Sequence, residues 1–140
     1  QKLYLSGRQQ YRDMMIPKGS EGAKQMIKAL RDGKHVGIMI DQKMNDGIPV
    51  PFFGADVMTA PALAQMALRF ACPVIGARVI REGGAYFRIE ISAPIYAEDT
   101  GDKQADIACF MGQTNQIIES WIRDKPDQWL WLHNRWPNNN

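Results

Sequence analysis

The sequence predicts an α/β fold in which helices flank a mixed, mainly parallel sheet. Residues 20–33 carry apolar side chains at helical spacing, and residues 59–70 repeat that pattern. Between them, residues 35–40 form a short apolar run that we interpret as a buried strand. The succession of helix, strand, loop and helix is typical of a parallel sheet rather than of a helical bundle.

Two further strands are expected to close this sheet as a hairpin. Residues 74–80 and 86–91 are rich in β-branched and aromatic side chains, and a turn containing Gly83 and Gly84 separates them. Such runs joined by a short glycine-containing turn indicate antiparallel strands. The predicted sheet is therefore mixed.

The composition indicates one globular domain of 140 residues. The net charge is only +2 and no Lys/Arg block appears, so a nucleic-acid partner is not expected. No apolar run approaches the roughly 18 residues of a membrane span. Cys72 and Cys109 lie in apolar surroundings without metal-ligand spacing, and we interpret both as reduced core residues.

Both predicted helices carry start and stop signals. Ser20 is the expected N-cap of the first helix, and Gly33 ends it. Thr59 is the expected N-cap of the second, with Pro61 in its first turn and Pro73 after its end. The expected inner faces are formed by Ala23, Met26, Ile27 and Leu30, and by Leu63, Met66, Ala67 and Phe70.

The stretch between the two helices has the character of a site. Asp41-Gln42 follows the predicted strand, which places a carboxylate at the carboxyl edge of the sheet, where open α/β folds keep their ligands. The next segment, Pro49–Gly54, is expected to be a loop because its prolines disfavour a helix or a central strand. This loop carries two adjacent aromatic residues, Phe52 and Phe53.

The last third of the chain predicts one long helix and an aromatic tail. A polar connection over residues 97–103 leads into an amphipathic helix that stops before Pro126. Its apolar stripe consists of Ile107, Phe110, Met111, Ile117, Ile118, Trp121 and Ile122. Trp129, Trp131 and Trp136 follow, and they suit either packing over the core or anchoring at a membrane interface.

The residues alone leave the chemistry open. No nucleophile elbow, phosphate-binding loop or metal cluster is present. The histidines, His35 and His133, suit structural roles, and in the expected strand His35 would lie roughly 20 Å from Asp41, too far for an acid/base pair. Asp41 suits a turn residue and a site carboxylate equally well. Two classes remain: part of an enzyme with an apolar substrate, or a non-catalytic surface-binding module.

Several segments carry a resemblance to a known family. Gly7-Arg8, the run KQMIKALRDGKHVGIMIDQ, the loop GIPVPFFG with TAPALA after it, and the ending PDQWLWLHNRW resemble the late acyltransferases of lipid A biosynthesis, the lauroyl/myristoyl transferase family. The resemblance covers essentially the whole chain in the same order. It implies a fold like that of the wider glycerolipid acyltransferase superfamily.

The resemblance implies transfer of a fatty acyl group from an acyl carrier protein thioester to a hydroxyl of a lipid A precursor. The expected location is the cytoplasmic face of a Gram-negative inner membrane, and no cofactor or metal is expected. The superfamily's catalytic motif is His and Asp or Glu with four residues between them. The fifth residue after His35 is Ile40 and the fifth after His133 is Asn138, so neither histidine fits. We expect the motif upstream of Gln1, and hence a chain truncated at its amino end.

The site residues that the resemblance implies are therefore supporting ones: Gly7, Arg8, Asp41, Gln42, Phe52, Phe53 and Arg135. Arg8 would bind phosphate or stabilise the oxyanion, and Asp41 would hold Arg8 or the acceptor. Phe52 and Phe53 would line the lipid-binding face. Arg135 would contact anionic lipid or pair with an internal carboxylate.

Four arginines could form a docking patch for acyl carrier protein, which is acidic. They are Arg69, Arg78, Arg81 and Arg88. Solvated charges without a partner are the alternative reading of the same residues. The alternative to the enzyme is a non-catalytic module that binds anionic lipid or an acidic protein.

Overall fold

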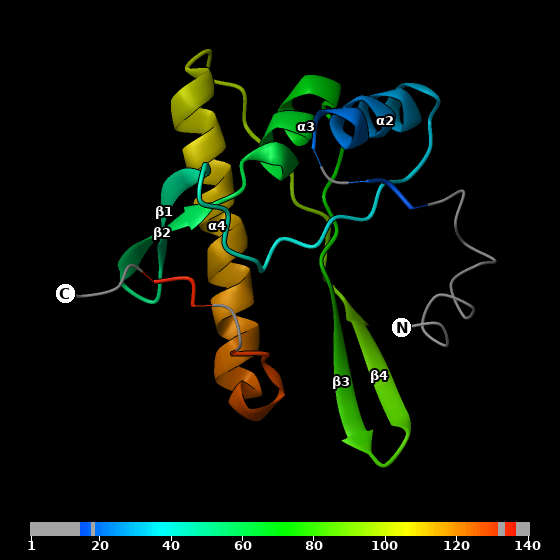
Figure 1. Ribbon diagram of the computed structural model, residues 1–140, viewed down its shortest axis with the longest axis vertical. Coiled ribbons are helices and arrows are strands. Elements are labelled where there is room, and N and C mark those ends of the chain that lie inside the picture. The colour runs from blue at the N-terminus through cyan, green and yellow to red at the C-terminus, as the bar shows by residue number, and fades with distance from the viewer. Residues whose placement is uncertain (1–14, 18, 132–133, 137–140) are drawn as a thin grey trace. The chain divides into compact units, whose positions relative to one another are not determined.

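The computed structural model describes residues 15–17, 19–131 and 134–136 (Figure 1). The chain divides into two compact units, Gln1–Gly37 and Ile38–Asn140, and each is described by itself. Helices combine with two small antiparallel sheets, which is consistent with an α/β class. Each sheet has two strands, so the mainly parallel sheet that we expected is not present in the described part of the chain.

In the first unit, helix α2 spans Ser20–Arg31. Gly19 rather than Ser20 occupies its N-cap position, so the predicted cap is wrong by one residue. The predicted end is confirmed, since Gly33 has a φ of 70° and the next amide, of Lys34, donates to the carbonyl of Ala29 at 2.9 Å. This left-handed residue closes the last turn of the helix, as glycine commonly does.

Residues 35–40 do not form a strand, contrary to the prediction. A strand is stabilised by backbone hydrogen bonds to a neighbour, and none of the described strands pairs with this segment. Its apolar residues are not fully buried either, and Met39 is 77% exposed. The apolar run is therefore a connection without regular secondary structure.

The second unit begins with a hairpin where we expected a loop. Strands β1 (Ile48–Phe52) and β2 (Ala55–Thr59) pair antiparallel. Val50 and Phe52 are fully buried while Pro49 and Pro51 are exposed, so the segment alternates like a half-buried strand. Prolines are tolerated because β1 pairs, among the described strands, with β2 alone and so has an open edge.

The turn between β1 and β2 has two residues with positive φ, Phe53 at 50° and Gly54 at 80°. Positive φ at both central positions matches the right-handed twist of a hairpin. For a phenylalanine this conformation is unfavourable. The amide of Phe53 donates to the Glu119 carboxylate at 2.7 Å. This hydrogen bond ties the turn to the long helix that contains Glu119.

Helix α3 spans Ala62–Phe70, and Pro61 occupies its N-cap position. Thr59 is not its N-cap, because it is the last residue of β2 and is fully buried. Of the predicted inner face, Ala67 is buried, and Leu63 packs against the core.

Strands β3 (Ala77–Gly83) and β4 (Tyr86–Ile91) form the predicted hairpin as a separate sheet. Their register pairs Val79 with Ile89, and both side chains are more than half exposed. Just before this hairpin, Val74 bridges to Ile95. The hairpin is therefore confirmed, although it closes no larger sheet among the described strands.

The long predicted helix is confirmed as α4 (Lys103–Asp124), followed by the short 3-10 helix η2 (Pro126–Gln128). The Asp102 carboxylate caps α4 by accepting from two backbone amides. Figure 1 shows α4 alongside β1 and β2, and the core fills the space between them. Five of its apolar residues are buried: Ile107, Phe110, Met111, Ile118 and Ile122.

The structure bears on the predictions made for the cysteines and for the tryptophans. Cys109 is exposed and Cys72 is half-buried, so the core placement of Cys109 is wrong. Trp129 and Trp136 pack against the core, as one of the two readings predicts, whereas Trp131 is 53% exposed. Within the described ranges, no helix has both the length and the apolar character needed to cross a bilayer.

Candidate functional site

The Asp41-Gln42 turn lies in a strap, residues 41–47, that runs along β2. The amide of Met44 donates to the carbonyl of Met58 at 3.3 Å. Gly47 lies so close to Thr59 that an added Cβ would be 2.3 Å from its carbonyl oxygen. Asp41 is half-buried and Gln42 is exposed. Backbone contacts with β2 therefore fix the strap that carries Asp41.

Phe52 and Phe53 have different environments. Phe52 is fully buried in a cluster with Val57, Ile118 and Ile122, so it offers no surface to a lipid in this structure. Phe53 is half-buried, and the guanidinium of Arg123 lies 4.7 Å from its ring centroid. Of the two, only Phe53 has solvent-accessible surface for a ligand.

Among the predicted site residues that the structure describes, Arg135 is a charged residue that is almost completely buried. Only 2% of it is exposed. Its guanidinium carbon lies 4.1 Å from the centroid of the Phe52 ring, and the Phe52 ring in turn packs 5.5 Å from that of Trp136. Of the two roles expected for Arg135, contact with a lipid is not supported, because the side chain has almost no exposed surface.

Two polar side chains of the core bind Arg135. Its Nη2 donates to Thr59 Oγ1 at 3.2 Å and to Asn115 Oδ1 at 3.4 Å. Asn115 donates in turn to the carbonyl of Pro51 at 3.0 Å, which ties α4 to β1. Burial lowers the pKa of Arg135 from its ordinary value, and the Asp41 carboxylate raises it in opposition.

Sequence reasoning missed Thr59 and Asn115 as partners of Arg135. Asn115 carried a usable signal, since it stands on the buried face of α4, between Met111 and Ile118 at helical spacing. A polar residue at a core-facing position needs a hydrogen-bond partner, so it predicts a polar neighbour. Nothing in the sequence says which neighbour it is.

Gly7, Arg8 and His133 lie outside the described residues. The expected approach of Arg8 to Asp41 therefore stays a prediction. Within the described ranges, no group of His, Cys, Asp and Glu side chains gathers that could hold a metal ion.

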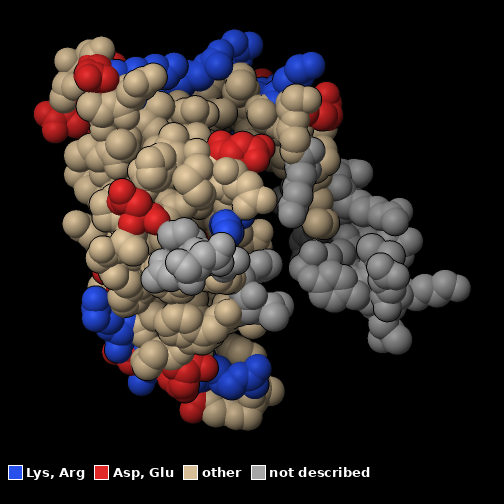
Figure 2. Space-filling view, turned by 60° about the vertical axis from the view of Figure 1, so that its left-hand side comes forward, with Lys and Arg blue, Asp and Glu red and all other residues tan. Residues whose placement is uncertain are grey.

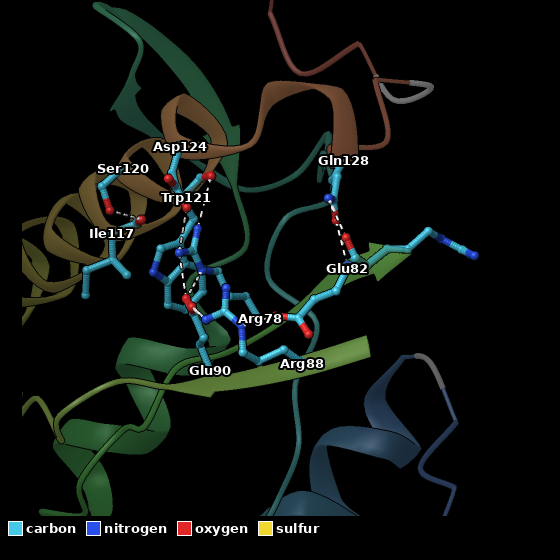
Figure 3. A network of polar contacts seen from close by, with 10 residues as sticks. Arg78, Glu82, Arg88, Glu90, Ile117, Ser120, Trp121, Asp124 and Gln128 are labelled. Atoms are coloured by element: carbon cyan, nitrogen blue, oxygen red, sulfur yellow. Dashed lines mark hydrogen bonds and ion pairs between the residues drawn. The ribbon is translucent and has the colours of Figure 1, made fainter. Parts of the chain in front are cut away.

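The expected arginine patch is largely engaged in internal contacts (Figure 3). Arg78 binds Glu90 and, at 2.8 Å, Asp124, and it also donates to the carbonyl of Trp121. Arg88 pairs with Glu82 and with the same Glu90. These contacts join β3 and β4 to the end of α4 and neutralise positive charge that a docking patch would need.

Arg69 and Arg81 each lie over a neighbouring ring, Phe70 and Phe87 respectively. Figure 2 shows side chains of both charge signs on one face, with wide uncharged areas between them. The surface in that view is thus not a continuous basic field. Docking of an acidic protein stays a prediction for this patch.

The comparison with known families agrees with the resemblance. The sequence model of the bacterial lipid A biosynthesis acyltransferases matches residues 1–138. No curated protein matches the chain.

Proposed function

Because the chain belongs to the bacterial lipid A biosynthesis acyltransferase family, we propose that its parent protein acylates a lipid A precursor with acyl carrier protein thioester as the donor. The family match over residues 1–138 is the observation that carries this proposal. An acyltransferase function of the lipid A type follows from the family. What we propose beyond the family is the identity of the acyl donor and of the acceptor.

In the proposed reaction, a histidine base removes the proton from an acceptor hydroxyl, and the hydroxyl oxygen attacks the thioester carbonyl carbon. The carbon–sulfur bond then breaks, and the carrier leaves as a thiol that takes up the proton. An acidic residue fixes the tautomer of the base. Neither His35 nor His133 has an acidic residue at the fifth position after it. We therefore place this pair in a part of the protein outside these residues, and we expect the 140-residue chain alone to be inactive.

The described residues support a positioning role in this reaction. Asp41 is half-buried on a strap that backbone contacts hold against β2, so its carboxylate keeps some access to a ligand. Gln42 beside it is exposed and adds an amide that both donates and accepts hydrogen bonds. We propose that this turn orients the acceptor and that Arg8 stabilises the oxyanion.

The inner membrane's cytoplasmic face is the proposed location, since a lipid A precursor is itself an amphiphile. Leu130 and Trp131 support contact with a lipid surface, because they are 68% and 53% exposed. Tryptophan is favoured at membrane interfaces, where its ring meets both apolar and polar groups.

The test is an acyl-transfer assay with the complete protein, including its His-x-x-x-x-Asp/Glu motif, and with acyl carrier protein thioester as donor. We expect the Asp41→Ala variant to lose turnover by roughly 10- to 100-fold while it keeps its fold, because orientation of the acceptor is lost. Asp56→Ala is the matched control, since Asp56 is exposed on β2, and should retain the rate. An unchanged rate for Asp41→Ala would show that Asp41 serves only as a turn residue. If the complete protein transferred no acyl group, the proposed enzymatic function would be refuted.

The second candidate function is a non-catalytic module that binds anionic lipid or an acidic protein. The observation that favours it is the lack of a fitting His and acid pair in this chain. It predicts binding to anionic vesicles or to acyl carrier protein together with no turnover by the complete protein.

A further inference from the structure

The guanidinium of Arg135 is a buried cation that is incompletely satisfied. Its Nη2 has two partners, but its Nε and Nη1 are buried without a hydrogen-bond partner. No ion pair joins Arg135 to a carboxylate of the described residues. Removing a charge from water without a counterion is strongly unfavourable, so a nearby carboxylate would stabilise the charged form of Arg135.

The packing brings the Asp41 turn to the same place. Ile40, directly before Asp41, packs against the cluster that contains Phe52. The guanidinium of Arg135 lies over the ring of Phe52. The strap beyond Asp41 stays on β2, whose last residue, Thr59, binds Arg135. Two segments far apart in the sequence thus meet on one hairpin.

Electrostatics agree with this placement. Among the described residues, Asp41 is the carboxylate that favours the charged form of Arg135 and so opposes the effect of burial on its pKa. The neutral partners of Arg135, Thr59 and Asn115, accept hydrogen bonds but bring no counter-charge.

We propose that Arg135 is a positioning residue: its buried guanidinium is the electrostatic partner of the Asp41 carboxylate and holds the Asp41-Gln42 turn in place over β1 and β2. Arg135 then acts through Asp41 and does not touch substrate, in keeping with its lack of exposed surface. The consequence for catalysis rests on the proposed function, whereas the pairing of the two residues does not.

A double-mutant cycle in the folding equilibrium tests the pairing with the complete protein. Urea unfolding is followed for Arg135→Met, Asp41→Asn and the double variant. We expect the two residues to be coupled by about tenfold in the equilibrium constant, within the usual range for interacting neighbours. The matched control is a second cycle in which Asp56→Asn takes the place of the Asp41 variant. Asp56→Asn should show no coupling to Arg135→Met. Additive effects of Arg135→Met and Asp41→Asn would overturn the proposal.

Two further comparisons keep the test decisive if Arg135→Met does not fold. In the otherwise natural protein, Asp41→Asn should destabilise by about tenfold and Asp56→Asn should not. Arg135→Lys keeps the positive charge, so Asp41→Asn should still destabilise in that background. Equal effects of Asp41→Asn and Asp56→Asn would overturn the pairing.

The acyl-transfer rate separates positioning from a general effect on stability. Under conditions in which all variants are folded, Arg135→Met and Asp41→Asn should lower kcat by a similar factor, and the double variant should be no slower than the slower single one. Arg135→Lys should restore most of kcat. Losses that multiply in the double variant would overturn positioning through Asp41. Absence of acyl transfer by the natural complete protein would refute the proposed function, while the unfolding cycle would still decide the pairing.

Discussion

Lys28 and Asp32 lie one turn apart at the end of α2, with 2.6 Å between Nζ and Oδ2. The hydrogen bond from Lys28, and then its positive charge, lower the pKa of Asp32 from its ordinary value of 3.8. A carboxyl whose pKa is lower in the folded state contributes stability above its unfolded pKa. This contribution is lost as the pH falls through the folded pKa.

We therefore expect the Asp32 carboxyl carbon, followed by NMR, to titrate below pH 3.8. Lys28→Met should move the midpoint upward, because it removes both the hydrogen bond and the charge. Lys24→Met is the matched control on the same helix and should leave the midpoint in place. An unmoved midpoint in Lys28→Met would show that the ion pair is not formed in solution.

At the scale of elements, the strap over residues 41–47 and strand β2 are joined by close backbone approach. Gly47 has no room for a side chain, since an added Cβ would lie 2.3 Å from the carbonyl oxygen of Thr59. Gly83, at the end of β3, has nothing within 4 Å of the same hypothetical atom. The two glycines thus differ in packing.

Gly47→Ala should lower the free energy of unfolding by about 1–3 kcal/mol, because the strap must shift away from β2. It should also lower acyl transfer by the complete protein, since the strap carries Asp41. Gly83→Ala is the control and should change stability by less than about 0.5 kcal/mol. Urea unfolding measures both, and equal stabilities for the two variants would contradict the close approach.

At the scale of the whole molecule, the exposed aromatic tail gives a prediction about membranes. Leu130 and Trp131 are exposed, whereas Trp129 and Trp136 are packed against the core. A membrane-facing Trp131 would move into a less polar environment on binding, which shifts tryptophan emission to shorter wavelength.

We expect such a shift when anionic vesicles are added, and a smaller one with vesicles of neutral lipid. Trp131→Ala should remove most of the shift. Tyr96→Ala is the control, since Tyr96 is also an exposed aromatic, at 63%, but lies outside the tail. If the emission of the natural protein does not change with vesicles, the tail serves core packing alone.

The sequence by itself determined the elements whose signals are local. The apolar stripe of α4, the glycine that ends α2, and the two β-rich runs of β3 and β4 each act within about twenty residues of chain. The sequence also identified the family, whose model matches residues 1–138. These features need no knowledge of distant neighbours.

Only the tertiary structure decided which distant residues meet. The apolar run over 35–40 has the composition of a strand, but none of the described strands pairs with it, whereas the proline-containing segment before Gly54 gains a partner in β2. In the same way, Arg135 reaches Thr59 and Asn115 across 76 and 20 residues of sequence. Pairing and burial depend on contacts between distant segments, and spacing along the chain does not specify them.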